Sequence, residues 1–224
     1  MIAAVVRAPA VTAEVFRDPP APAPPFPAEA ALVAGAVEGR RREFTVVRSC
    51  ARAALARLGV APAPLLPGPG GAPRWPAGIV GSMTHCRGYR GAAVARAAEL
   101  RSIGCDAEPN GPLPRPGMLD MIALPGERAW VRALGLREPS VHWDRLLFSA
   151  KESVYKAWYP LTGRWLDFEE AVVTLDPRAG TFRAELLVPG PEVDGRELTG
   201  FDGRWTADRG LLLTAVVVAA AAAG

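Results

Sequence analysis

The feature that most constrains this chain is a dense run of breaker residues close to its midpoint. Residues 109–117, PNGPLPRPG, contain four prolines and two glycines. Proline lacks the backbone N–H that helices and central strands require, so regular structure is expected to stop here. Patterns typical of both helix and strand occur on either side. We therefore predict an α+β chain in two halves, residues 1–110 and 111–224.

In the first half, the strongest helical pattern covers residues 40–59. Its apolar residues recur at three- and four-residue steps, and Gly59 is suited to end the helix. A shorter helix is expected over residues 29–39, and strands over residues 79–86, 91–97 and 100–105.

The second half begins with helical patterns and ends with strand patterns. Helices are expected over residues 118–122, 127–136 and 146–159, the last one stopped by Pro160. Strands are expected over residues 171–176, 181–188, 197–210 and 211–219. Turn residues separate these strands, which favours an antiparallel meander.

Composition narrows the classes of protein. The net charge of +3 is too small to predict a nucleic-acid partner, and arginine supplies almost all the cations. The odd set Cys50, Cys86 and Cys105 contains no Cys-x-x-Cys pair, which favours free thiols in a reducing cytoplasm. The apolar segment 211–224 is too short to span a bilayer, so we expect a cytoplasmic protein without a membrane partner.

A pair of carboxylates, Asp106 and Glu108, follows the strand predicted over residues 100–105. Residues two apart in an extended segment share a face, and two carboxylates there would suit Mg²⁺. A solvated turn is the other interpretation, because acidic residues and proline are common in turns.

Glu152 and Lys156 lie four residues apart in FSAKESVYKAW, so they are neighbours on a helix. An ordinary surface ion pair would explain them, and so would a capping box formed by Ser149 and Glu152. The aromatic residues around them leave few faces for free solvation, which favours a functional role.

The segment GSMTHC carries one of the two histidines, His85, with hydroxyls at Ser82 and Thr84. Together these groups could bind a phosphate, although a histidine in a strand is often structural. His142 has no partner pattern and is taken as structural. The chain has no P-loop, dinucleotide, serine-hydrolase or zinc-protease motif.

In combination, these motifs resemble a known family. The ordered set EFTVVRSCARAAL, PRWPAGIVGSMTHCRGYRGAAVA, IGCDAEP and FSAKESVYKAWYPL is similar to 4′-phosphopantetheinyl transferases of the Sfp and enterobactin-synthetase-component-D type. The resemblance runs from about Arg40 to Asp167. It implies two similar α+β halves that form an intramolecular pseudo-dimer, each with a small antiparallel sheet and a long helix.

The resemblance also implies roles for individual residues. Asp106, Glu108 and Glu152 would hold Mg²⁺, and Glu152, Lys156 and Asp106 would form the catalytic group. Phosphates of coenzyme A would be bound by Arg40, Arg48, Ser82, Thr84, His85 and Lys156. Helical spacing instead pairs Arg41 with Arg48. Pro67 occupies the place where the family often has a basic residue, and Arg74 is the expected substitute.

The activity implied is transfer of 4′-phosphopantetheine from coenzyme A to a serine of an apo acyl or peptidyl carrier protein, with release of 3′,5′-ADP. Glu152 is either the base for the serine proton or only a metal ligand. A coenzyme A-binding protein without transferase activity is the alternative function. Two fused halves have little need of a partner subunit, so a monomer is expected. The pathway served is not predictable from these motifs.

Overall fold

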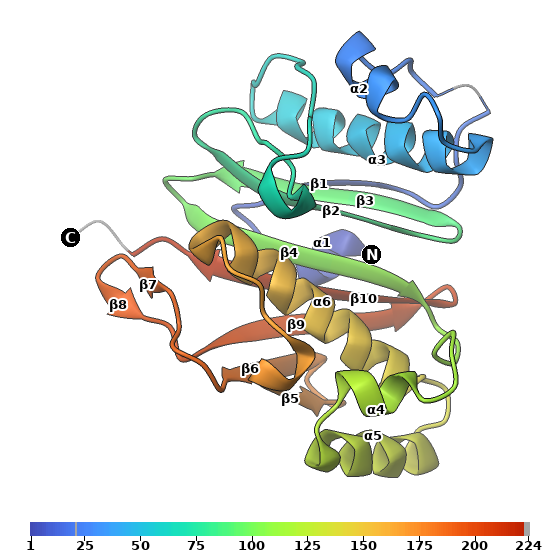
Figure 1. The fold of residues 1–224 in the computed structure, drawn as a ribbon, viewed down its shortest axis with the longest axis vertical. Coiled ribbons are helices and arrows are strands. Elements are labelled where there is room, and N and C mark those ends of the chain that lie inside the picture. Colours follow the sequence, from blue (N-terminus) through green and yellow to red (C-terminus); the bar gives the residue numbers. More distant parts are fainter. Residues whose placement is uncertain (21, 222–224) are drawn as a thin grey trace.

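The computed structural model describes residues 1–20 and 22–221, so the last three residues of the alanine-rich tail lie outside the described part (Figure 1). The two larger antiparallel sheets, of three and five strands, are each covered on one face by a helix of 20 residues. The predicted α+β fold with two such halves is confirmed.

The first sheet has three strands in the order β1-β3-β2, formed by β1 (Val11–Val15), β2 (Ile79–Cys86) and β3 (Tyr89–Arg96). Helix α3 (Glu38–Arg57) packs on it, and Ala51 and Leu55 meet Ile79 and Val94 in the core between them. Small residues on α3 bring the helix close to the sheet. The short helix α2 (Pro27–Leu32) and a single turn, η1 (Pro69–Gly71), complete this half.

The second sheet has five strands in the order β4-β10-β9-β6-β5. Its members are β4 (Leu100–Pro109), β5 (Ala171–Asp176), β6 (Thr181–Leu186), β9 (Gly200–Asp208) and β10 (Leu211–Ala219). Strands β5, β6, β9 and β10 form the expected meander. A small hairpin, β7 (Glu192–Val193) and β8 (Arg196–Glu197), branches from it.

Helix α6 (Trp143–Thr162) covers this second sheet, and Trp143 and Trp158 are buried against Phe182 and Val216. The helix crosses β4 at Gly104, where an added Cβ would overlap the backbone of Ser153 and lie 2.6 Å from the amide nitrogen of Ala157. Only glycine permits this close approach, which fixes α6 directly above β4. Helix α5 (Pro125–Arg137) packs against α6, and the short helix α4 (Met118–Ile122) contacts both α5 and the turn η2 (Phe168–Glu170).

The two sheets meet where β2 lies beside β4, with helix α1 (Ile2–Val5) packed behind them (Figure 1). The Ser82 hydroxyl accepts a hydrogen bond from the Cys105 N–H at 3.0 Å. The strand pairing places β3 in the first sheet and β4 in the second, so the chain passes from one sheet to the other between these two strands. The boundary after residue 110 remains a prediction.

Several predicted element limits are wrong, and each error has a local cause. Strand β4 continues to Pro109, so the carboxylates of Asp106 and Glu108 lie in a strand and not in a turn. The helix expected over residues 29–39 is two elements, because α2 ends at Leu32 and α3 begins at Glu38. Helix α6 begins three residues early and includes Pro160 in its last turn, and Gly163 in a left-handed conformation ends it. Ser149 therefore lies inside α6, which rules out the capping box.

Candidate active site

A cavity of about 730 Å³ lies between α3, β2 and α6 and is covered by the loop that contains η1. The residues from the sequence predictions that line it are Arg40, Arg48, Arg74, Ser82, His85, Glu152 and Lys156. The lining is thus strongly cationic on the α3 side and carries one carboxylate on α6. Thr84, Asp106 and Glu108 are not part of this lining and lie next to it, on β2 and β4.

Lys156 joins the cavity to these carboxylates. Its Nζ lies 2.6 Å from Oδ1 of Asp106 and 3.3 Å from the carbonyl oxygen of Cys105. Burial lowers the pKa of Lys156, but the charge and hydrogen bond of Asp106, aided by Cys105 and Glu152, raise it overall. Lys156 therefore carries its charge at neutral pH, and it pairs with Asp106 rather than with Glu152.

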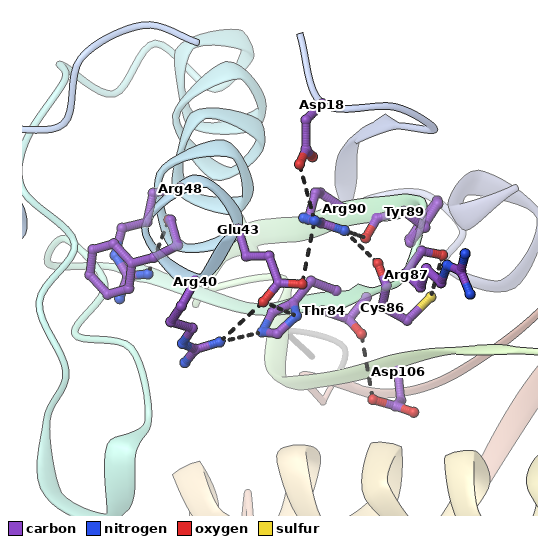
Figure 2. Close-up of polar contacts among 12 residues, drawn as sticks. Asp18, Arg40, Glu43, Arg48, Thr84, Cys86, Arg87, Tyr89, Arg90 and Asp106 are labelled. Carbon is purple, nitrogen blue, oxygen red and sulfur yellow. Dashed lines mark hydrogen bonds and ion pairs between the residues drawn. The ribbon is translucent and has the colours of Figure 1, made fainter. Parts of the chain in front are cut away.

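Asp106 is buried, and only one of its two oxygens has a partner. Oδ1 accepts a hydrogen bond from Lys156. It also accepts from the Thr84 hydroxyl at 3.4 Å, the contact that Figure 2 shows. Oδ2 has no hydrogen-bond partner among the described residues. Thr84 and His85 are adjacent in a strand and point to opposite faces. This placement favours Thr84 as a residue that positions Asp106 over one that contacts a phosphate with His85.

Glu108 is held by an arginine that no sequence motif singles out. Arg145 on α6 approaches Oε2 of Glu108 with two nitrogens, Nε and Nη2, each at 2.7 Å. Burial, followed by repulsion from Asp106, raises the pKa of Glu108, and Arg145 and Lys156 only partly oppose this. Arg145 precedes Glu152 by seven residues, so helical spacing places both on the β4-facing side of α6.

Glu152 lies half-buried between the cavity and the carboxylates. Burial raises its pKa; Lys156 lowers it, while Asp106 and Glu108 raise it further, and the net change is upward. A carboxylate with a raised pKa is a better proton acceptor near neutral pH than an ordinary one. The three acidic side chains thus influence one another across α6 and β4.

These residues suit a hard divalent cation in their chemistry. The donor set is made of carboxylate oxygens, Oδ2 of Asp106 is buried without a partner among the described residues, and repulsion from neighbouring carboxylates raises the pKa of Glu108 and of Glu152. Within residues 1–20 and 22–221, no three His, Cys, Asp or Glu side chains are already gathered as a metal site. Both carboxylates on β4 are already engaged in ion pairs: Arg145 contacts Glu108, and Lys156 contacts Oδ1 of Asp106.

On the opposite side of the cavity, Arg40 and His85 lie together. Nη1 of Arg40 is 3.2 Å from Nε2 of His85. Arg41, which helical spacing pairs with Arg48, instead contacts Glu38 at 3.1 Å and the Ala34 carbonyl, and it does not line the cavity. The prediction that favoured Arg41 is therefore wrong. The long arginine stem lets Arg40 reach the cavity from the flank of α3.

Arg48 is anchored more firmly than Arg40. Its Nε donates to the Leu65 carbonyl at 2.8 Å, its guanidinium stacks 3.3 Å from the centre of the Phe44 ring, and Glu29 lies 4.0 Å away. Burial lowers its pKa to about 10 despite the attraction of Glu29. Glu29 is fully buried and also binds Arg52 at 2.8 Å and the Leu65 N–H at 2.8 Å. Arg48 thus presents a fixed cation to the cavity.

The loop over the cavity rests on α6 through a glycine. Gly70 has a φ of +62°, and an added Cβ there would overlap the Tyr159 ring. Arg74, on the same loop, lines the cavity, and its role as a substitute for a basic residue at Pro67 remains a prediction.

Lys151, the other lysine of the FSAKESVYKAW segment, has a structural role. Nζ of Lys151 lies 2.8 Å from Glu127 Oε2 and donates to the carbonyls of Phe168 and Ala171 at 2.6 and 3.0 Å. Its side chain is 3% exposed, so it cannot reach a ligand in the cavity. Lys151 and Glu127 instead join α5, α6 and the start of β5.

A second cavity, of about 550 Å³, lies on the face of the five-stranded sheet that α6 does not cover. It is lined by Arg7, Arg183 and Arg204 among others, and by none of the predicted site residues. The predicted site residues Arg40, Arg48, Arg74, Ser82, His85, Glu152 and Lys156 line the cavity between α3 and α6 instead.

Comparison with known proteins finds two family matches along the chain. Residues 28–95 match the family described as the 4′-phosphopantetheinyl transferase N-terminal domain, and residues 102–206 match the 4′-phosphopantetheinyl transferase superfamily. The gap between the two matches covers the end of β3, the turn after it and the first residues of β4. Together they cover well over half of the chain.

Three relatives are similar over nearly their full length. The chain is 64% identical over 226 residues to 4′-phosphopantetheinyl transferase Svp of Streptomyces mobaraensis, covering 99% of this chain and 91% of that protein. It is 51% identical over 210 residues to PptT of Mycobacterium tuberculosis (92% and 91% covered). It is 53% identical over 201 residues to Npt of Nocardia iowensis (86% and 89% covered).

The fold and the matches define a transferase of two related halves. The chain belongs to the 4′-phosphopantetheinyl transferase superfamily, and the family predicted from its motifs is confirmed. Within the described residues, no helix has the length and apolar character needed to cross a membrane.

Proposed function

We propose that this protein transfers the 4′-phosphopantetheine moiety of coenzyme A to a serine of an apo acyl or peptidyl carrier protein and releases 3′,5′-ADP. The observation that supports this most is the layout of the 730 Å³ cavity. Cations from α3 and the covering loop line one side, and Lys156 with three nearby carboxylates lies at the other. Cations are needed to bind the phosphates of the nucleotide, and carboxylates with a lysine are needed at a metal-dependent transfer centre.

The cationic side suits the nucleotide end of coenzyme A. Arg40, Arg48, Arg74 and His85 supply donors for the phosphates, with Arg48 the most rigidly held. Ser82 lines the cavity, but its hydroxyl already accepts from Cys105. We infer that Arg40 and His85 receive the 3′-phosphate and that Arg74 supplies the charge absent at Pro67.

Mg²⁺ would be held by Asp106, Glu152 and Glu108, the last after exchanging its contact with Arg145. When bound, it would neutralise charge on the pyrophosphate as a Lewis acid. The unpartnered Oδ2 of Asp106 supports this assignment. Thr84 and Lys156 hold the other oxygen of Asp106 and so fix the direction of Oδ2.

In the reaction, the serine oxygen forms a bond to the β-phosphorus of coenzyme A, and the bond from that phosphorus to the bridging oxygen breaks. The serine proton passes to Glu152, directly or through water, and 3′,5′-ADP leaves with the bridging oxygen. Lys156 remains protonated and stabilises the charge on the leaving phosphate. The raised pKa of Glu152 supports its role as the base.

The remaining expectations concern setting and partners. We propose that the enzyme acts as a monomer in the cytoplasm, because one chain supplies both sides of the cavity. We expect neither nucleic acid nor a membrane as partner, since the net charge of +3 gives no large basic surplus.

The alternative function is binding of coenzyme A without transfer. The two functions are separated by measuring 3′,5′-ADP in reactions that contain coenzyme A and Mg²⁺, with and without an apo carrier protein. Transfer predicts stoichiometric 3′,5′-ADP only when the apo carrier is present. Tight binding of coenzyme A with no nucleotide release, across acyl and peptidyl carriers, would support the alternative.

A further inference from the structure

Glu43 lies among Arg40, His85 and Arg90, next to the side of the cavity that Arg40 and His85 line. Its Oε2 is 3.7 Å from Nη1 of Arg40 and 3.8 Å from Nδ1 of His85, and its Oε1 is 3.4 Å from Nη2 of Arg90. His85 and Arg90 are direct partners across the β2–β3 pair, so their side chains share a face beneath α3. Figure 2 shows Glu43 between Arg40 and Arg90.

Arg90 holds the carboxylate of Glu43 in place. The Arg90 side chain is 6% exposed and donates to the carbonyls of Cys86 and Tyr89, while Asp18 lies 3.2 Å from its Nη2. A buried guanidinium with this many acceptors is held in one orientation. Glu43 is therefore directed at His85 by an arginine that does not line the cavity.

The contacts of His85 determine where its proton lies. A guanidinium group can only donate hydrogen bonds, so Nε2 of His85 must accept from Arg40. The ring is then neutral, and its single proton is on Nδ1, the nitrogen that faces Glu43. Nε2, which lies against Arg40, is left as the ring nitrogen without a proton, on a residue that lines the cavity.

We propose that Glu43 is a positioning residue that makes His85 take up a proton when the 3′-phosphate of coenzyme A binds. This rests on the proposed function, in which His85 and Arg40 receive that phosphate. The phosphate attracts the Arg40 N–H, which frees Nε2. Nε2 then takes one proton from solvent and donates it to the phosphate, and Glu43 stabilises the new charge from the Nδ1 side.

The other charged groups facing His85 are compatible with this. They are Arg40 from α3, Arg90 from β3 and Lys156 from α6, and all three oppose protonation. Burial lowers the pKa of His85 and these cations add to the effect, with Glu43 alone opposing them. Without Glu43, the protonated ring would face only cations until the phosphate arrives. By stabilising the protonated ring, the Glu43 carboxylate therefore favours ligands that carry a 3′-phosphate.

The test is calorimetric titration of the full chain with coenzyme A and with 3′-dephospho-coenzyme A, in buffers of different ionisation enthalpy. Coenzyme A is expected to bring uptake of about one proton at neutral pH, and the dephospho compound none. Glu43→Gln should remove most of this uptake and weaken coenzyme A about tenfold, with little change for the dephospho compound. Glu43→Asp should restore part of the uptake.

The matched control is Glu38→Gln, an exposed acid on the same helix that pairs with Arg41 away from the cavity. It should behave as the wild type with both ligands. Nitrogen-15 spectra of the two histidines add a structural readout: the Nδ1–H form of His85 is expected in the free enzyme, and the doubly protonated ring is expected with coenzyme A bound but not in Glu43→Gln.

Unchanged proton uptake in Glu43→Gln, or equal weakening of both ligands, would overturn the proposal and reduce Glu43 to a structural brace. His85→Gln separates this from the proposed function. If that variant still prefers coenzyme A over the dephospho compound by the wild-type ratio, His85 does not bind the 3′-phosphate. If His85→Gln loses the preference for coenzyme A and Glu43→Gln keeps it, His85 does bind the 3′-phosphate. Only the proposed role of Glu43 is then wrong.

Discussion

Lys156 on α6 and Asp106 on β4 form an ion pair with 2.6 Å between Nζ and Oδ1, at the point where the helix lies directly on the strand. This pair connects the cavity to the carboxylates. It leaves Oδ2 of Asp106 without a partner among the described residues. The position of one lysine therefore sets which carboxylate oxygen is free for a ligand.

The two lysines of this chain, Lys151 and Lys156, should titrate in opposite directions from the ordinary pKa of 10.5. Burial lowers the pKa of Lys151, while Asp106 raises that of Lys156 above it. The stabilisation from the Lys156 pair is then complete below pH 10.5 and is lost as pH rises through its folded-state pKa. Carbon-13 spectra of labelled lysine, with only two side chains to assign, measure both values.

Asp106→Asn is the matching variant for this titration. It should lower the pKa of Lys156 and leave that of Lys151 unchanged, because Lys151 pairs with Glu127 instead. A Lys156 pKa below that of Lys151 in the wild type would contradict the pairing.

Lys151 and Glu127 should matter for stability more than for chemistry. Both side chains are almost fully buried, so removing either charge alone by Lys151→Met or Glu127→Gln is expected to cost about 3–5 kcal/mol of unfolding free energy. Urea denaturation measures this, and the double variant should lose less than the sum. Asp120→Asn, which breaks the exposed pair with Arg128, should cost at most about 1 kcal/mol.

Glu152→Gln should lower the transfer rate about 100-fold or more, with coenzyme A affinity nearly unchanged, because it removes the proton acceptor and retains the shape. Steady-state rates over a range of Mg²⁺ concentrations check this. Recovery at saturating Mg²⁺ would leave Glu152 as a metal ligand only. Glu185→Gln, at an exposed position on β6, is the control and should keep the wild-type rate.

Gly104→Ala should move α6 away from β4. The added Cβ would overlap the Ser153 carbonyl, which is helix backbone and cannot rotate away, so the expected loss is about 1–3 kcal/mol or more. Thermal unfolding measures the loss, and transfer activity should fall with it because α6 carries Glu152 and Lys156. Gly111→Ala, where nothing lies within 4 Å, should change neither.

Long periodic elements of this fold were predictable, because their patterns repeat over many residues. Helix α3 and strands β2 and β10 follow the limits expected from apolar spacing within a few residues. Strand β1 gives no such signal, since it has five residues and all are only partly buried. The end of α6 was predicted too early, at Pro160. A proline in the last turn removes only one hydrogen bond, so the helix continues to Thr162.

The site could be predicted only in part from the sequence, for a different reason. Ordered motifs identified Asp106, Glu152 and Lys156, but the partners of these residues depend on how α6 crosses β4. Spacing along one helix paired Glu152 with Lys156, whereas packing pairs Lys156 with Asp106. Arg145 and Glu43 act through tertiary contacts, and only their helical spacing from Glu152 and Arg40 could have indicated them.

The most direct test of the central claim is the intact mass of an apo carrier protein after incubation with this protein, coenzyme A and Mg²⁺. We predict a gain of one phosphopantetheine on the carrier serine. The gain should be absent when the serine is replaced by alanine and strongly reduced with Asp106→Asn. No gain across acyl and peptidyl carriers, with a folded enzyme that binds coenzyme A, would contradict the account.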